Sequence, residues 1–94
     1  MKNDIVICKP EDGKIYHLET GASDKGSVWI FRYCLYNKPF ATLTGCNYCL
    51  RIDNEGRIAY RDKLHGYIGD DSKVEVLKPA NENEIAIFNR VFEL

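Results

Sequence analysis

Residues 28–36, VWIFRYCLY, constrain the fold of this chain more than any other stretch of its sequence. β-branched and aromatic residues dominate the run, and both kinds are enriched in β-strands. Side chains alternate between the two faces of a strand. Trp29, Phe31, Tyr33 and Leu35 should therefore share one apolar face, which we expect to lie against the core. The opposite face carries Arg32 and should meet water or a partner at least in part.

Shorter strands are expected on both sides of this run, separated by turn residues. The Pro and Asp-Gly signals at 9–13, the Pro at 37–39 and the Gly that ends 53–56 favour tight reversals. The apolar or alternating segments between them predict strands at 4–8, 14–18, 40–44, 48–52, 57–60 and 74–77. Many short strands at close spacing are typical of a small curled antiparallel sheet.

Near the C-terminus the apolar residues recur with a different spacing. Asn81 stands three residues before Glu84, which predicts a capping box at the start of a helix. Ile85, Phe88 and Phe92 then recur at spacings of three and four, as on one face of an amphipathic helix. We therefore predict a mainly β (α+β) fold: one domain over residues 1–94, a small SH3-like or partly open antiparallel β-barrel with one C-terminal helix.

Composition places the chain among soluble, ordered proteins. Its 94 residues are 45% hydrophobic and carry a formal net charge of −1. No apolar run approaches the roughly 20 residues of a membrane span, and no signal peptide is visible, so we expect no membrane association. We expect a cytoplasmic protein, in the host cell cytoplasm if a phage encodes it. The four cysteines should then be thiols, because that compartment is reducing.

The stretch TGCNYC, in which two residues separate Cys46 from Cys49, is the strongest candidate for a metal or redox site. A structural zinc site needs four ligands, and the chain has no second paired motif. Redox chemistry needs such a pair at a helix N-terminus, whereas this pair lies between predicted strands. We therefore expect thiols packed as small apolar groups. Their positions have opposite parity, so at most one should face inward in a regular strand and the other should be exposed. A zinc-stabilised interaction module remains an alternative.

No catalytic constellation is visible. The only histidines, His17 and His65, are not linked to a nucleophile and are expected at the surface. We expect Asp70 and Asp71 to be two solvated carboxylates of a loop, because loops that bind divalent metals have a longer, regularly spaced acidic pattern. The glycine-rich phosphate-loop and dinucleotide motifs are absent. We expect a protein that is not an enzyme and that uses no cofactor.

The remaining signal is a basic middle with interleaved tyrosines. Residues 25–65 hold seven Lys or Arg and three Asp or Glu, against 13 and 14 in the whole chain. Arginine makes bidentate contacts to phosphate or carboxylate, and tyrosine stacks on bases. The predicted binding residues are Arg32, Tyr36, Arg51, Arg57, Tyr60 and Arg61. Generic duplex nucleic-acid binding is not expected at this net charge. A solvated outer sheet face is the competing interpretation.

Two segments also carry a resemblance. Trp29-Ile30-Phe31-Arg32-Tyr33 in the long strand and Ala80-Asn81-Glu82-Asn83-Glu84 at the helix start are similar to small SH3-like β-barrel proteins of Bacteroidota and their phages. The resemblance covers about the last two thirds of the chain, and its motifs are structural. It implies an SH3-like barrel, a phage or prophage setting and no catalytic residue.

With the absence of catalytic motifs, this resemblance leads us to expect a phage-type accessory inhibitor of a host defence system. It would block a defence protein such as a CRISPR effector, or sequester a small anionic signalling nucleotide. The alternative is a structural or regulatory β module that self-assembles through the edge of strand 28–36.

Overall fold

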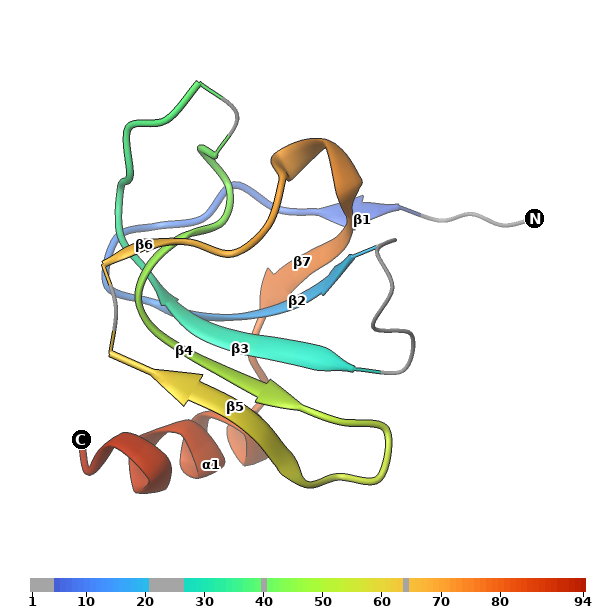
Figure 1. The fold of residues 1–94 in the computed structure, drawn as a ribbon, viewed down its shortest axis with the longest axis vertical. Helices are drawn as coiled ribbons and strands as arrows, with labels where there is room; N and C mark the ends of the chain where they lie inside the picture. Colours follow the sequence, from blue (N-terminus) through green and yellow to red (C-terminus); the bar gives the residue numbers. More distant parts are fainter. Residues whose placement is uncertain (1–4, 21–26, 40, 64) are drawn as a thin grey trace.

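A computed structural model describes residues 5–20, 27–39, 41–63 and 65–94 (Figure 1). The elements of that part of the chain are mostly strands. They are β1 (Val6–Ile7), β2 (Ile15–Thr20), β3 (Val28–Tyr33), β4 (Gly45–Ile52), β5 (Ile58–Asp62), β6 (Gly66–Tyr67), the 3₁₀ helix η1 (Asp71–Lys73), β7 (Val74–Pro79) and α1 (Glu82–Phe92).

The strands form one sheet in the order β1-β7-β2-β3-β4-β5, and β6 pairs with the start of β4. All pairs are antiparallel except β1 with β7, which run parallel. The sheet curls but does not close, because β1 and β5 stay at opposite edges. The predicted mainly β, partly open fold with one C-terminal helix is confirmed. The parallel pair was not foreseen.

Each side of the sheet carries a hydrophobic core. On one side Phe31 and Leu18 pack with other apolar residues in a core beneath the β6–η1 connection. On the other side Phe88 and Phe92 of α1 pack over Ile30 and the adjoining β4. The face of Ile30 and Arg32, which we expected to meet water or a partner at least in part, is mostly covered by α1. The helix buries Ile30 completely and leaves Arg32 half-buried.

The long central strand is shorter than predicted. β3 ends at Tyr33, and the Leu35 side chain, expected in the core, is 63% exposed. Beyond Tyr33 the backbone crosses Gly45 so closely that a Cβ there would overlap the carbonyl oxygen of Cys34 and lie 2.9 Å from the Cβ of Tyr36. The chain therefore leaves the sheet plane at this crossing, and the period-two pattern no longer applies.

The predicted strand at 40–44 is wrong for its described residues 41–44, and residue 40 lies outside the described part. A carboxylate fixes this loop instead. The Asp71 side chain accepts hydrogen bonds from the N–H and hydroxyl of Thr42, from the N–H of Leu43 (2.8 Å) and from the hydroxyl of Thr44 (3.0 Å). Asp71 is thus an organising group, not one of a solvated pair.

The C-terminal helix begins as predicted. The Asn81 side chain accepts from the N–H of Glu84, and the Glu84 carboxylate accepts from the N–H of Asn81. This reciprocal capping box satisfies backbone donors that the first turn leaves unpaired. None of the helices in the described part of the chain has both the length and the apolar composition of a membrane span.

Candidate functional site

The β4–β5 hairpin carries four of the six predicted binding residues: Arg51, Arg57, Tyr60 and Arg61. Its turn is held by Asp53, whose carboxylate accepts from the N–H groups of Glu55 and Arg57 at 2.9 Å each. The hydrogen bond from Arg57 holds the pKa of Asp53 below its usual value. Gly56 supplies the positive φ of 83° that completes the reversal.

Arg51, Tyr60 and Trp29 form a row across three strands. The register pairs Trp29 with Arg51 and Arg51 with Tyr60, so all three lie on one side of the sheet. The Trp29 and Tyr60 rings meet edge to face with centroids 5.8 Å apart, and the Arg51 guanidinium lies 5.9 Å from the Trp29 ring. Tyr60 is 41% exposed. We predicted Trp29 in the core only, because the cross-strand register that adds it to this row is not visible in the local sequence.

Neighbouring polar groups hold the row in place. Arg51 donates to the Ser27 hydroxyl at 3.2 Å, and the Tyr60 hydroxyl donates to Asp62 at 2.9 Å. The hydrogen bond to Asp62 raises the pKa of Tyr60 above its usual value, because it favours the protonated phenol. Tyr60 therefore presents a neutral ring and a fixed hydroxyl at neutral pH.

Arg61 lies on the other side of the sheet. It pairs with Leu50, which α1 covers, so its side chain lies next to the end of that helix. A pocket of about 470 Å³ opens between the ends of β5 and α1. Its lining residues are Arg61, Asp62, Lys63, Val91, Phe92 and Glu93. The predicted binding residues of the hairpin thus lie on both sides of the sheet.

Arg32 and Tyr36 do not join this group. The Arg32 guanidinium stacks 4.4 Å over the Tyr48 ring, and its Nε donates to the Asn47 side chain at 3.1 Å. Tyr36 lies beside β6, where its ring stacks on that of Tyr67 with centroids 5.6 Å apart. Two of the six predicted residues therefore lie away from the hairpin, each against an aromatic ring.

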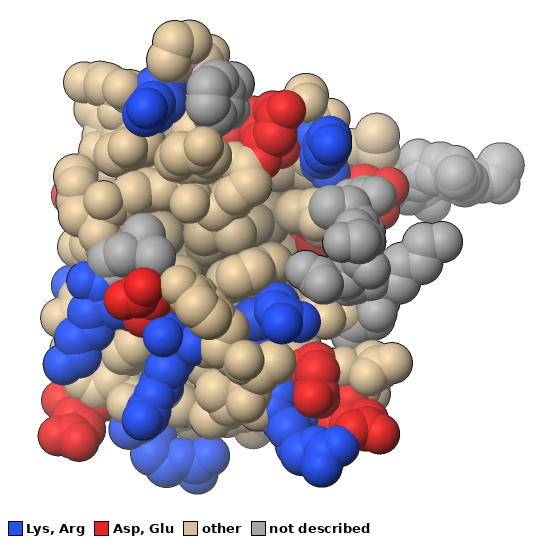
Figure 2. Space-filling view, viewed as in Figure 1, with Lys and Arg blue, Asp and Glu red and all other residues tan. Residues whose placement is uncertain are grey.

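The positive charge of the hairpin is only partly neutralised. Figure 2 shows Lys and Arg gathered on the lower half of one face, over β4 and β5, with a few acidic side chains between them. Arg57 forms an ion pair with Glu55. Within the described part of the chain, no carboxylate lies within ion-pair distance of Arg51 or Arg61. These two guanidinium groups keep the capacity to bind an external anion.

Cys46 and Cys49 are both buried, at 0% and 1% exposure, so the prediction that one is exposed is wrong. The register pairs Arg32 with Tyr48 but Tyr33 with Cys46, which leaves Asn47 as an extra residue in β4. Such a β-bulge shifts the alternation by one, so both thiols face the same core.

The interaction between the two thiols shifts their pKa values in opposite directions. The interaction with Cys49, together with burial, raises the pKa of Cys46. The same interaction lowers the pKa of Cys49, while burial opposes that change. Among the residues that the structure describes, no three or more His, Cys, Asp or Glu side chains are grouped so as to hold a metal ion.

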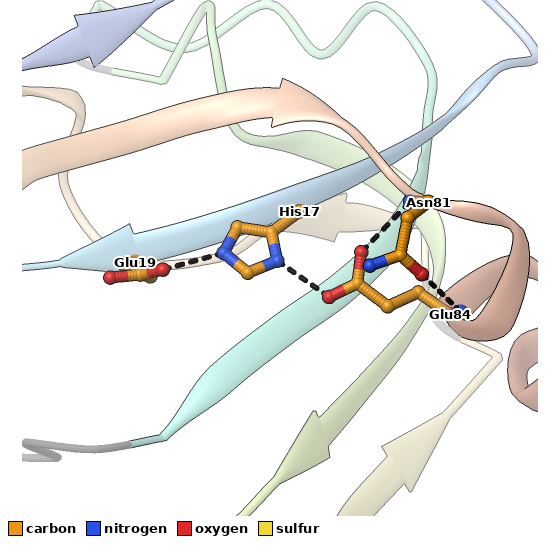
Figure 3. Close-up of polar contacts among 4 residues, drawn as sticks. All are labelled: His17, Glu19, Asn81 and Glu84. Carbon is orange, nitrogen blue, oxygen red and sulfur yellow. Dashed lines mark hydrogen bonds and ion pairs between the residues drawn. The ribbon is translucent and has the colours of Figure 1, made fainter.

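His17 is buried, at 7% exposure, although we expected both histidines at the surface. His65 is exposed, as expected. The Nδ1 of His17 lies 2.7 Å from Glu84 and its Nε2 lies 2.6 Å from Glu19 (Figure 3). The carboxylates lie on opposite sides of the ring, so they do not converge on one substrate or metal position. This arrangement joins β2 to α1.

Comparisons with known proteins do not extend this description. No protein-family model matches the chain, and no similar protein was found among curated proteins or solved structures.

Proposed function

We propose that this chain is a binding protein that contacts an anionic partner through its β4–β5 hairpin. We call the contact region the hairpin surface: Trp29, Arg51, Arg57, Tyr60 and Arg61. The exposure of β5 is the observation that carries the proposal. All five of its residues are exposed, whereas the central strands β2, β3 and β4 of the same sheet have no exposed residue.

The residue types on the hairpin surface support a binding role. Trp, Tyr and Arg are the side chains that most often dominate the energy of protein–protein contacts. Arg51 and Arg61 can form charge-assisted hydrogen bonds without first breaking an ion pair with a described residue. The Trp29–Tyr60 pair offers apolar area that is already fixed by the row, so little side-chain entropy is lost on contact.

We further propose that the partner is a host defence protein, such as a CRISPR effector, which the chain inhibits by occupying an acidic surface. The small size and the resemblance to small barrel proteins of phages support this assignment. Sequestration of a small anionic signalling nucleotide is the competing form of the same proposal. An adduct of nucleotide mass in native mass spectrometry of the purified protein would favour that form.

Self-assembly through the edge of strand 28–36 has no support, because that strand lies at the centre of the sheet. β2 pairs with one edge of β3 and β4 with the other. In the described part of the chain, the sheet ends at β1 and β5. Association by strand pairing would use an outer strand such as β1, β5 or β6.

A phage plating assay tests the inhibitor proposal. The chain is expressed in bacteria that carry individual defence systems, and plating of a targeted phage is counted. We expect the wild type to restore plating in at least one system. The triple variant Arg51→Ala/Arg57→Ala/Arg61→Ala should lose this effect, and its affinity for the purified target should fall by about tenfold or more.

The matched control is Lys9→Ala/Lys14→Ala/Lys38→Ala, which removes the same positive charge from exposed positions outside the hairpin. It should behave as the wild type does. Failure of the wild type against every system would contradict the inhibitor proposal. Full activity of the hairpin variant would show that the contact lies elsewhere.

A further inference from the structure

The outer edge of β5 is open to another strand. The sheet order ends at β5, and no other described segment pairs with its far side. The register pairs Arg51 with Tyr60 but Ile52 with Ile58, so Ala59 is an extra residue that bends the first half of the strand. The regular part of this edge is therefore the short stretch 60–62. Such an edge exposes backbone donors and acceptors that an extended segment can pair with.

A pocket lies immediately beside this regular stretch. It has a volume of about 470 Å³ and opens between the end of β5 and the end of α1. Val91 and Phe92 supply its apolar part, whereas Arg61 and Lys63 supply charge from the strand side. Pockets of a few hundred Å³ accept single side chains or small ligands. A strand added to β5 would run along the opening of this pocket.

The charges at the pocket favour an acidic occupant. Arg61 and Lys63 are exposed, and no described carboxylate lies within ion-pair distance of either. Asp62 and Glu93 also line the pocket. The Asp62 carboxylate accepts a hydrogen bond from the Tyr60 hydroxyl and forms no ion pair with Arg61 or Lys63. Both cations are therefore available to the carboxylates of an occupant.

We infer that the protein binds an extended acidic segment of a partner protein as an additional strand on β5. Main-chain hydrogen bonds to residues 60–62 would supply affinity, as in other cases of strand addition. An apolar side chain of the segment would enter the pocket at Val91 and Phe92. Neighbouring carboxylates of the segment would meet Arg61 and Lys63. This inference rests on the proposed function and specifies how the hairpin surface recognises its partner.

Selection from a random peptide library tests the inference. The full chain is immobilised, and displayed peptides that bind it are enriched and sequenced. We expect extended peptides with Asp or Glu flanking an apolar residue. Their affinity should fall by about tenfold or more for Arg61→Glu/Lys63→Glu, because the added charges repel the peptide. The control Lys9→Glu/Lys38→Glu makes the same change in net charge at other exposed positions and should bind as the wild type does.

Backbone methylation of a selected peptide tests the strand geometry. Alternate N–H groups of a strand point to the same neighbour, so N-methylation at one parity should abolish binding and at the other parity should not. Equal effects at both parities would overturn the inference. So would failure to enrich acidic peptides, equal binding by Arg61→Glu/Lys63→Glu, or equal weakening in the control. Circular dichroism confirms that each variant is folded.

These outcomes are separable from those of the plating assay. If the peptide test is negative but Arg51→Ala/Arg57→Ala/Arg61→Ala still loses inhibition, only the inference of strand addition is contradicted. Both fail together if that variant also remains fully active. A mass that doubles with concentration in light scattering, and that Arg61→Glu/Lys63→Glu abolishes, would identify a second copy of the chain as the occupant and overturn the inference.

Discussion

At the residue scale, two positions in β4 decide how the centre of the sheet is built. Gly45 lets the backbone after β3 cross at a distance that no side chain allows. Asn47 is the extra residue of a β-bulge, and its side chain accepts from Arg32 at 3.1 Å. The bulge turns Cys46 and Cys49 to the same side, where both pack in the core.

Thiol labelling tests this arrangement. We expect maleimide to modify Cys8 first, because it is the half-buried cysteine, while Cys34, Cys46 and Cys49 are buried. Buried thiols react only when the structure opens. Peptide mapping by mass spectrometry after short labelling times would measure the order, and Cys8→Ser should remove the fast reaction. Fast labelling of Cys46 or Cys49 in the folded protein would show that the bulge is absent.

The alternation of side chains along a strand predicted the correct side of the sheet in the regular part of β3. It gave the wrong side where a strand is irregular. Phe31 and Tyr33 face the core as predicted. The pattern gave the wrong side for one of the two β4 cysteines, because a bulge leaves no reliable mark in the residue types. It also failed for Leu35, because contacts with Gly45, distant in sequence, end the strand first.

At the element scale, His17 connects β2 to the first turn of α1. Glu84 uses one carboxylate oxygen for the capping box and the other for His17 (Figure 3). Glu19 occupies the second ring nitrogen. Each ring nitrogen of His17 therefore has a carboxylate partner, and one of the two partners lies on α1. The position of the helix on the sheet therefore depends on a polar contact as well as on Phe88 and Phe92.

Variants of the two glutamates should differ in stability. Glu84→Ala removes the helix cap and a partner of the buried His17, so we expect a loss of about 1–3 kcal/mol in the free energy of unfolding. Glu84→Gln should lose less, because glutamine can serve in a capping box. Glu19→Ala should lose less than about 1 kcal/mol, because 43% of that side chain is exposed. Urea denaturation measures all three. A larger loss for Glu19→Ala would contradict this account of the helix contact.

Helix α1 was predictable because its signals are local. The capping box and the spacing of Phe88 and Phe92 lie within twelve residues of one another. The side of the sheet that the helix covers was not predictable, because it depends on contacts with β3 and β4 that are distant in sequence. The loop 41–44 was misread for the same reason, since Asp71 holds it from nearly thirty residues away.

At the scale of the whole molecule, the sheet has a buried centre and two edges. The sequence predicts the class of fold through its many short strands and one helix, and the structure confirms it. The parallel pairing of β1 with β7 and the position of β5 at an edge are long-range features that strand patterns do not encode. The predicted binding residues gather only in part for this reason. Four lie on the hairpin, whereas Arg32 and Tyr36 pack elsewhere.

The strand β5 lies at an edge of the sheet, and we propose that a partner binds there. Amide hydrogen exchange of the isolated protein, followed by NMR, tests it most directly. We predict the slowest exchange in β3, which has a paired strand on each side and buried residues at its centre. Within residues 58–62, amides that point away from β4 should exchange quickly and those that pair with β4 slowly. Uniform slow exchange along β5, as strong as in β3, would mean that this edge is already covered and would contradict the account.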